Sequence, residues 1–511
     1  MNILYTPQHL LSKTSFSKMK NLNFKFNSFN NNIYVLLCML FSINLTAFGQ
    51  ATTIFSQNFE TASWNLPTGL SPAWSGTTTP ANNIWHLNTY TTGWSSASGA
   101  YSPTGANGTT QSARFHSYDA TSATTGDLIT PTIDLSAYPN QPKTLMFYMI
   151  NTSGTDKVDV FLSTDGTTYG SSLGTYTIYS SWTLIALPLG TTSSSTVKVK
   201  FTATSDFGTT DIGIDEVKIV NATVFTSSGS WTAPAGVCTA TVECWGGGGA
   251  GGGTGTAGVV KTGGGGGGGA YARNPSVTVT PGSAYAVVVG AGGIGVSAAA
   301  GNAGGSSTFN ATTVVAVGGG GGGATNTSTG GVAGTGGASG SCTGTTVYSG
   351  GNGAAGTGTT TGSGGGGSSA GSATVGNNAS GVTGGAAPTD GGRGANGVNA
   401  NGVGAVGFSI GAGGSGSYGS ATSTTARAGG NGFSGLVYIS YTPSTVLSAP
   451  VITTTTLCPG SSLTVSGTSS EASGTTITVY KNGTILTTTT VSSGNWSVTG
   501  LTLTGGDVIT A

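Results

Sequence analysis

Charged side chains are scarce in this sequence. Of 511 residues, 15 are Lys or Arg and 15 are Asp or Glu, so the formal net charge is zero. Surfaces that bind nucleic acid or anionic membranes need clustered Lys and Arg, and the composition therefore argues against both kinds of partner. There are three histidines, and one of them, His9, lies in the leader described next. Acid–base catalysis has few groups to use.

Long apolar runs are missing after the first 49 residues. The apolar run Ile33–Phe41 follows four lysines and precedes Ala47 and Gly49, small residues at the two positions that signal peptidase reads. It is too short to span a bilayer comfortably and is typical of a secretory signal peptide. Residues 1–49 are predicted to be this signal peptide, with Met19 as an alternative start. The mature chain, from about Gln50, is expected to be secreted or held at the cell surface.

Cysteine is rare, and four cysteines follow the leader: Cys238, Cys244, Cys342 and Cys458. Export permits disulfides. Cys238 and Cys244 lie in "VCTATVECW", which has the pattern of a strand, and positions that far apart on one strand are about 20 Å apart. They are not expected to pair with each other. No His or second Cys lies at zinc spacing. For Cys458 we expect a partner beyond residue 511.

Helical periodicity is absent, and residues 54 to about 221 show short alternating segments. They are "KTLMFYMI", "DKVDVFLSTDG", "WTLIALPL", "TVKVKFTA" and "DIGIDEVKIV", separated by clusters of Gly, Ser, Asn and Thr. Strands at such spacing favour a β-sandwich or jelly roll. Six aromatic residues crowd its early part, and Trp74 and Trp85 are expected in the core rather than in sugar contact. The others are Trp64, Tyr90, Trp94 and Tyr101.

Four stretches of this first segment resemble MAM-like modules of bacterial surface proteins, also called choice-of-anchor or cleaved-adhesin modules. They are "FSQNFE", "GDLITPTIDLS", "VDVFLSTDGTTY" and "IGIDEVKIV". The resemblance implies a β-sandwich, often with structural calcium, used for adhesion or carbohydrate contact. Carboxylates gather here too: Asp211, Asp215 and Glu216 lie around the last strand and Glu60 near the first. Calcium prefers such oxygens, and the resemblance indicates Glu60 and Asp215 as ligands; the alternative is solvated carboxylates at strand ends.

Glycine runs fill residues 223–442, but good strands interrupt them. "TATVECW", "YARNPSVTVTPGSAYAVVVG", "STFNATTVVAVGGG" and "GFSGLVYISYT" alternate too cleanly for disordered low-complexity chain, and the second reads as a hairpin turning at Pro281–Gly282. Together with "FTSSGSWTAPAGV" and "VECWGGGGAGGG", they resemble the glycine-rich domain of exported bacterial and phage tail-fibre-like proteins.

Glycine runs can form the extended threefold polyproline II helix, here called polyglycine II, and such helices can pack closely and bond through their backbones. Residues 263–269, seven consecutive glycines, would span about 20 Å in that form. A threefold helix turns some glycines inward and others to solvent. We therefore expect a valine scan along this run to give a stability profile with a period near three residues.

Residues 443–511 resemble a bacterial Ig-like module, with "GNWSVTG" and "GDVITA" as its marks. Asn482–Gly483 between alternating segments predicts a hairpin. The sequence stops at Ala511 inside an expected strand, so the module is read as truncated.

Three matches to catalytic or cofactor motifs are attributed to composition. Gly290, Gly292 and Gly295 fit GxGxxG, but no helix or acidic ribose partner follows. "GSSAG" at 367–371 fits a nucleophile elbow without a downstream His, and "GVVKT" at 258–262 lacks the Gly-Lys pair of a P-loop. His86 and His116 have no nucleophile or acid motif beside them and are read as packing or surface residues.

The sequence thus predicts an exported all-β protein: a jelly-roll β-sandwich at 50–222, a glycine-rich β domain with polyglycine II-type loops at 223–442, and a partial Ig-like sandwich at 443–511. Its expected work is adhesion or extracellular structure, without enzymatic activity, through contact with an extracellular glycan or protein surface. The expected cofactor is structural calcium or none. Two alternatives stay open: a non-catalytic part that tethers a larger secreted hydrolase to polysaccharide, and ice binding by a threonine face of the glycine bundle.

Overall fold

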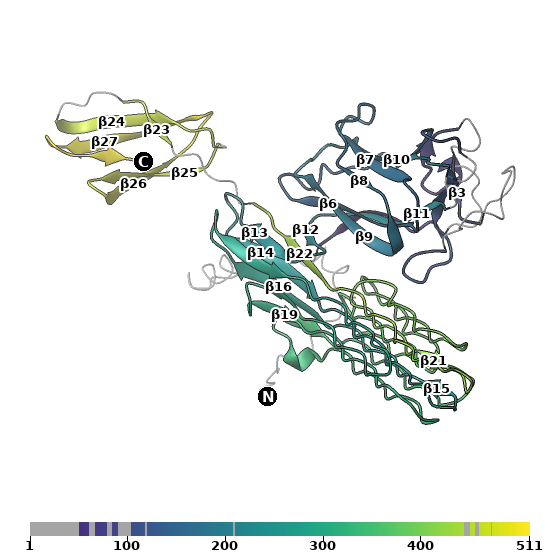
Figure 1. Ribbon diagram of the computed structural model, residues 1–511. Helices are drawn as coiled ribbons and strands as arrows, with labels where there is room; N and C mark the ends of the chain where they lie inside the picture. The colour runs from purple at the N-terminus through teal and green to yellow at the C-terminus, as the bar shows by residue number, and fades with distance from the viewer. Residues whose placement is uncertain are drawn as a thin grey trace, which may run out of the picture. The chain divides into compact units, whose positions relative to one another are not determined.

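The computed structural model describes residues 51–60, 67–78, 84–89, 104–117, 120–207, 210–443, 450–454, 459–471 and 473–511. Strands account for nearly all of its regular structure, and the all-β class is confirmed (Figure 1). η2 (Pro67–Gly69) and η5 (Ser339–Ser341) are single 3-10 turns. Within the described residues no helix has the length and apolar character needed to cross a bilayer. The predicted signal peptide and Cys458 lie outside these residues.

Two antiparallel sheets form the first segment, as predicted. One has the order β3-β4-β11-β6-β9, with β1 also paired to β11, and the other has the order β2-β5-β10-β7-β8. The strands are β1 (Thr53–Gln57), β2 (Ser75–Gly76), β3 (Trp85–Leu87), β4 (Ala113–Phe115), β5 (Thr125–Ile129), β6 (Lys143–Asn151), β7 (Lys157–Ser163), β8 (Gly174–Tyr176), β9 (Tyr179–Gly190), β10 (Lys198–Thr204) and β11 (Ile212–Val220).

The core of this sandwich follows from strand alternation. In β10 every second side chain is buried, because one face covers the opposite sheet and the other meets solvent. Trp74 and Trp85 are 1% and 0% exposed, so their predicted core position is confirmed. β6 is buried at all nine positions. Its residue Phe147 joins the sandwich core, whereas Met146 on the other face packs against Tyr438 of the glycine-rich segment.

Residues 223–442 contain two further sheets, with the orders β12-β22-β14-β16-β20 and β13-β17-β18-β19, and the small pair β15-β21. The strands are β12 (Thr223–Phe225), β13 (Gly229–Thr232), β14 (Thr239–Trp245), β15 (Lys261–Thr262), β16 (Tyr271–Thr278), β17 (Ala284–Val288), β18 (Ser307–Phe309), β19 (Val314–Ala316), β20 (Thr346–Tyr348), β21 (Tyr418–Gly419) and β22 (Leu436–Ser440).

The hairpin predicted around Pro281–Gly282 is wrong. The turn itself is present, because Ser283 N–H donates to the Thr280 carbonyl and Gly282 has a φ of 79°. However, β16 pairs with β14 and β20, while β17 pairs with β13 and β18. The turn therefore joins two facing sheets rather than two neighbouring strands. Both sheets have their own apolar faces to bury, and this arrangement closes a core around Trp231, Val242 and Phe309.

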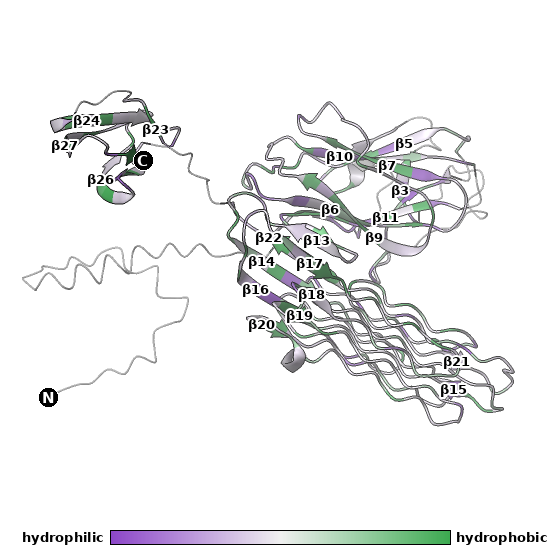
Figure 2. Ribbon diagram, turned by 60° about the vertical axis from the view of Figure 1, so that its left-hand side comes forward, coloured by the Kyte–Doolittle hydropathy of each residue, from purple (hydrophilic) through white to green (hydrophobic). Residues whose placement is uncertain are grey.

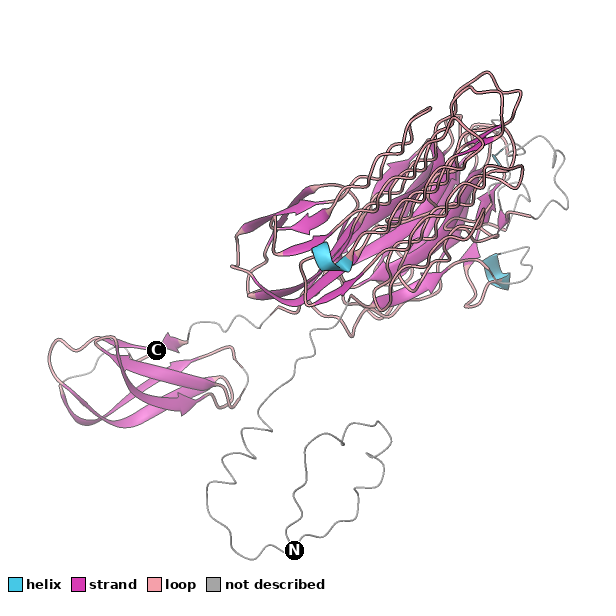
Figure 3. Cartoon of the chain, turned by 90° about the horizontal axis from the view of Figure 1, so that it is seen from below, coloured by secondary structure: helices cyan, strands magenta, loops and turns pink. Residues whose placement is uncertain are grey.

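The glycine runs extend from these sheets as a bundle of extended chains (Figures 1 and 3). In Figure 2 the bundle is mostly pale, because glycine is nearly neutral in hydropathy. Successive N–H groups of residues 263–270 donate to three neighbours in turn, at 2.7–3.0 Å, and the order repeats every third residue. The accepting runs are 411–417, 317–323 and 351–354, and the runs that donate to its carbonyls are 246–252, 331–337 and 364–370. This is the predicted polyglycine II arrangement.

The third segment contains two three-stranded sheets, β23-β24-β27 and β26-β25-β28. The strands are β23 (Val451–Ile452), β24 (Gly460–Thr468), β25 (Thr476–Lys481), β26 (Thr484–Thr490), β27 (Asn495–Leu503) and β28 (Ile509–Thr510). β25 and β26 form the predicted hairpin, and both of its turn residues, Asn482 and Gly483, have positive φ. Its core surrounds Val479 and Trp496.

Candidate functional site

The two predicted calcium ligands hold the same loop. β1 pairs with β11, and this pairing places Glu60, just after β1, near Asp215 within β11. Glu60 accepts hydrogen bonds from the N–H groups of Thr110 and Gln111, at 2.9 and 2.6 Å, and from the Thr110 hydroxyl at 3.0 Å. Asp215 accepts from Ala106 N–H at 2.7 Å. The structure therefore brings both residues to the loop of residues 104–112.

Negative charge is concentrated at this loop. Burial raises the pKa of Asp215 well above its ordinary value, and the neighbouring Glu216 raises it further. Burial also raises the pKa of Glu216. The nearby Lys218 lowers this pKa, and Glu60 raises it. A cation bound among these carboxyl groups would reverse the pKa shifts, because it favours the ionised forms.

The donor set fits calcium in its chemistry, with one restriction. Carboxylates beside a loop of backbone carbonyls are the oxygens that calcium takes. Each carboxylate has about four lone-pair sites. Glu60 uses three, and Asp215 also uses three, for Ala106 N–H, Glu216 N–H and the Thr109 hydroxyl. Few sites are left, and within the described residues no group of three or more His, Cys, Asp or Glu side chains converges on a metal position.

Loop 104–112 also contacts the glycine-rich segment. The Asn107 side-chain oxygen accepts from the Ser409 hydroxyl and, at 3.3 Å, from Arg393 N–H. The Arg393 guanidinium donates to the Gly108 carbonyl at 2.7 Å. The loop held by Glu60 and Asp215 is thus shared by two segments that lie far apart in the sequence.

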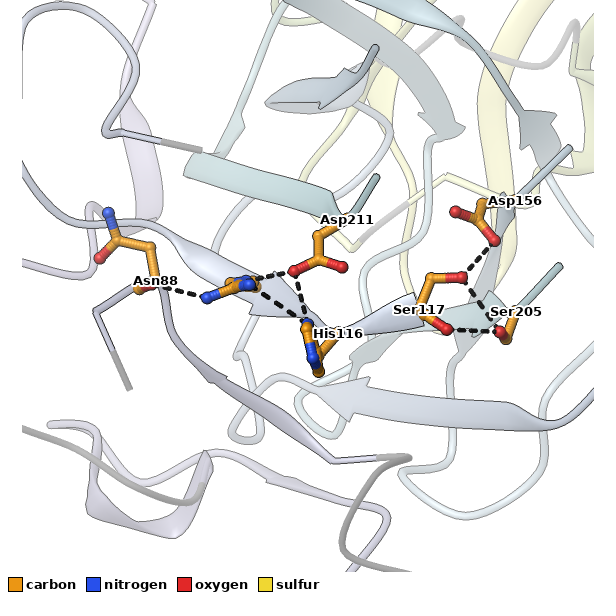
Figure 4. A network of polar contacts seen from close by, with 7 residues as sticks. Asn88, His116, Ser117, Asp156, Ser205 and Asp211 are labelled. Carbon is orange, nitrogen blue, oxygen red and sulfur yellow. Dashed lines mark hydrogen bonds and ion pairs between the residues drawn. The ribbon is translucent and has the colours of Figure 1, made fainter. Parts of the chain in front are cut away.

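His116 belongs to a buried polar network in the sandwich (Figure 4). Its Nδ1 lies 2.8 Å from the Asp211 carboxylate, to which the Arg114 guanidinium also donates. Arg114 donates as well to the Asn88 carbonyl at 3.3 Å. Arg114 is 1% exposed, and His116 and Asp211 are 0% exposed, so no substrate reaches them. His86, in β3, is 3% exposed. Both histidines are packing residues.

The apparent cofactor and nucleophile motifs lie inside the glycine bundle. Gly292 faces the Gly432 carbonyl so closely that a Cβ would not fit there. Ser368 and Ser369 are 0% exposed, and Ser369 Oγ accepts from Gly392 N–H at 2.7 Å. These residues serve backbone packing, as composition had indicated.

Several buried ionisable groups were not anticipated, and two of them, Glu243 and Lys261, belong to the glycine-rich segment. Glu243 in β14 is 1% exposed; it accepts from Tyr271 OH and from Ala51 N–H, both at 2.7 Å, and burial raises its pKa. Lys261 is 0% exposed, and its Nζ donates to the carbonyls of Ala257 and Ser420. The sequence could have indicated the burial of Glu243, because it is the one charged residue in the otherwise uncharged strand "TATVECW". Nothing local marks Lys261, because one of its two acceptors, the Ser420 carbonyl, comes from a turn far away in the sequence.

The cysteines of the described residues carry no disulfide. Cys238, Cys244 and Cys342 are free thiols. The expectation that Cys238 and Cys244 do not pair is confirmed, and they lie just before and within the continuous strand β14.

Comparisons with known proteins agree with the prediction of a glycine-rich domain at residues 223–442. The family model described as a glycine-rich domain matches residues 223–442. A comparison with curated proteins found no match. Among solved structures, the K1 cleaved adhesin domain of Lys-gingipain from Porphyromonas gingivalis W83 is 18% identical with a TM-score of 0.23, covering 33% of this chain and 97% of that one. The K3 cleaved adhesin domain of the same protein is 16% identical with a TM-score of 0.25, covering 34% and 99%.

A third similar structure holds the CBM22-1 and GH10 modules of the Clostridium thermocellum N-terminal endo-1,4-β-D-xylanase 10B in complex with xylohexaose. It is 14% identical with a TM-score of 0.22, covering 34% of this chain and 29% of that one.

Proposed function

We propose that this chain is an exported, non-enzymatic adhesion protein whose glycine bundle presents a set of loops to an uncharged extracellular glycan. The observation that carries the proposal is the meeting of four turn segments, three of them rich in Ser and Thr, at the end of the bundle that bears β15 and β21 (Figure 1). We call them the tip loops: residues 255–261, 325–329, 357–362 and 420–426. Ala257 N–H donates to Asn326 Oδ1 at 3.0 Å, and Gly358 N–H donates to the Thr262 hydroxyl at 2.6 Å.

Hydroxyl groups hold the tip loops in fixed shapes. The Thr325 hydroxyl donates to the Thr329 carbonyl at 2.6 Å, and the Thr357 hydroxyl donates to the Gly362 carbonyl at 2.9 Å. Buried Lys261 ties two of the loops through its carbonyl acceptors. A surface fixed in advance loses less conformational entropy on binding.

The chemistry of the tip loops favours a neutral, hydroxylated partner. They contain no Asp, no Glu and no aromatic residue, and their one cation, Lys261, is buried. Threonine and serine hydroxyls both donate and accept hydrogen bonds, as sugar hydroxyls do. A glycan therefore suits this surface better than a charged protein partner.

The test is binding of the full mature chain to an array of neutral polysaccharides. Replacing Thr327, Thr359 and Thr425 with Ala should reduce binding at least about tenfold, since each lost hydrogen bond is worth roughly 1 kcal/mol. The matched control is Thr335→Ala, an exposed threonine on the side of the bundle. Full binding by the triple variant, or binding that is lost only when residues 51–222 are removed, would place the glycan site in the first segment instead.

Calcium at loop 104–112 is the second part of the proposal. Glu60 and Asp215 would supply carboxylate oxygens, and the ion would stabilise a loop that both the sandwich and the bundle use. Thermal melting of the full chain should then shift upward with calcium relative to chelator. Glu60→Gln with Asp215→Asn should remove that share of the shift. An unchanged shift in this double variant would exclude both residues as ligands.

A further inference from the structure

A second pair of carboxyl groups lies at one end of the sheet β2-β5-β10-β7-β8. Asp156 comes directly before β7 and Asp206 shortly after β10, and these two strands pair with Thr204 opposite Lys157. The pairing register therefore makes the two acids neighbours, although 50 residues separate them in the sequence.

Asp156 is 0% exposed, and its two oxygens differ in their surroundings. Oδ1 accepts from the Ser117 hydroxyl at 2.5 Å and from Asp206 N–H at 2.6 Å. Oδ2 is also buried, and no hydrogen-bond donor among the described residues reaches it. A buried carboxylate oxygen without a donor is costly, which makes it the position where a ligand is needed.

The Asp206 carboxyl group approaches Asp156, and this contact concentrates negative charge. Burial and the nearby Asp206 side chain together raise the pKa of Asp156 to about 7. No ion pair among the described residues includes Asp156. Two adjoining carboxyl groups without a basic partner therefore leave a place for a bound cation or a retained proton.

The surroundings of the pair are rich in oxygen. Ser205 Oγ lies 3.0 Å from the Ser117 hydroxyl (Figure 4). It also donates to the Ala120 carbonyl at 2.8 Å. The Thr210 hydroxyl donates to the Ser153 carbonyl at 2.7 Å. Hard oxygen ligands of this kind select calcium or magnesium rather than transition metals.

We propose that Asp156 and Asp206 hold a divalent cation, calcium by preference, at a site separate from Glu60 and Asp215. The cation lies against Asp156 Oδ2 and takes its other ligands from Asp206 and water. It joins the turn before β7 to the turn after β10, and through Ser117 to the end of β4. The rival arrangement is a proton shared by the two carboxyl groups.

The experiment uses the full mature chain at pH 8 and counts calcium ions by titration calorimetry. The wild type should bind two ions, and Glu60→Gln with Asp215→Asn should bind one. That remaining ion should still raise the melting temperature by a few degrees. Adding Asp156→Asn or Asp206→Asn should abolish both the binding and the shift. Asp159→Asn is the matched control, because Asp159 is another acid of β7 that is paired with Lys157, and it should change neither.

The result that overturns the proposal is equally specific. If the Glu60 and Asp215 double variant binds no calcium, or if its calcium shift survives Asp156→Asn and Asp206→Asn, the pair holds a proton instead. If the wild type binds a single ion that Asp156→Asn removes and the double variant keeps, the site at Asp156 stands and the site at Glu60 and Asp215 fails.

Discussion

Two runs of the glycine bundle show what position in the bundle does to the same kind of sequence. In the central run, residues 263–269, every glycine is buried, and a Cβ at any of the seven would lie within 3.0 Å of neighbouring backbone. In the edge run, residues 330–338, burial repeats every third residue: 331, 334 and 337 are buried, whereas 332, 335 and 338 are exposed. A threefold helix has three faces, and the edge run leaves one of them to solvent.

The burial of the central run contradicts the period of three that the sequence predicted for a valine scan of residues 263–269. A period of three requires one open face, and the central run has none, because runs 246–252, 331–337 and 364–370 receive its three Cβ directions. The repeat in the central run lies in its hydrogen-bond partners instead. The threefold helix was foreseen correctly, but its surroundings were not.

The largest effect is expected in the central run. Replacing any of the glycines 263–269 with Val should destabilise the protein by at least about 3 kcal/mol, the upper end for overpacking, because backbone rather than a flexible side chain must move. Denaturant unfolding should show a profile without a period. A clear period of three along this run would mean that one of its faces is open after all.

Amide exchange should separate the centre from the tip loops. N–H groups of the central run bond to carbonyls at 2.7–3.0 Å, so they should exchange only through global unfolding. Among the described residues, the Thr329 and Thr361 N–H groups donate only to threonine hydroxyls, at 3.3 and 3.4 Å, and they should exchange quickly. Equal rates for the two sets in a mass-spectrometric experiment would contradict a rigid bundle.

Edge runs should show the period that the centre lacks. Gly331, Gly334 and Gly337 also face neighbouring backbone, but the edge run can shift toward its open face, so Val at each should cost about 1–3 kcal/mol. Changes at Val332, Thr335 and Ala338 should cost little. Ala354→Val and Ala355→Val form a matched pair, since Ala354 is 8% exposed and Ala355 is exposed. Only the first should lower the free energy of unfolding; equal effects would argue against the assigned faces.

The smallest effect concerns an asparagine at the edge. Asn352 Oδ1 accepts from Gly336 N–H at 2.8 Å, so a side-chain oxygen takes the place that a backbone carbonyl has in the central run. Asn352→Ala should cost about 1 kcal/mol, the usual net value of one hydrogen bond. Val332→Ala, at a side chain that is 71% exposed, is the control and should be nearly neutral. A loss as large as that of a central Val variant would show that Asn352 does more than close the edge.

One of the two candidate cation sites could be predicted from the sequence, and the other could not. Glu60 and Asp215 were selected from the residue types near the first and last strands, together with a resemblance, and the structure brings them to one loop. Asp156 and Asp206 were not foreseen, because each is an ordinary acid in a polar turn. Only the pairing of β7 with β10 makes them neighbours.

By itself the sequence determined what depends on nearby residues. Alternation with a period of two specified the strands, positive φ at Asn482–Gly483 made a hairpin turn, and the continuity of β14 kept Cys238 and Cys244 apart. Tertiary structure alone decided that β16 and β17 belong to different sheets and that residues 263–269 lie at the centre of the bundle. The physical reason is that glycine has no side chain. Identical glycine runs offer the same backbone donors and acceptors, so which run lies beside which is settled only when the sheets that anchor them have paired.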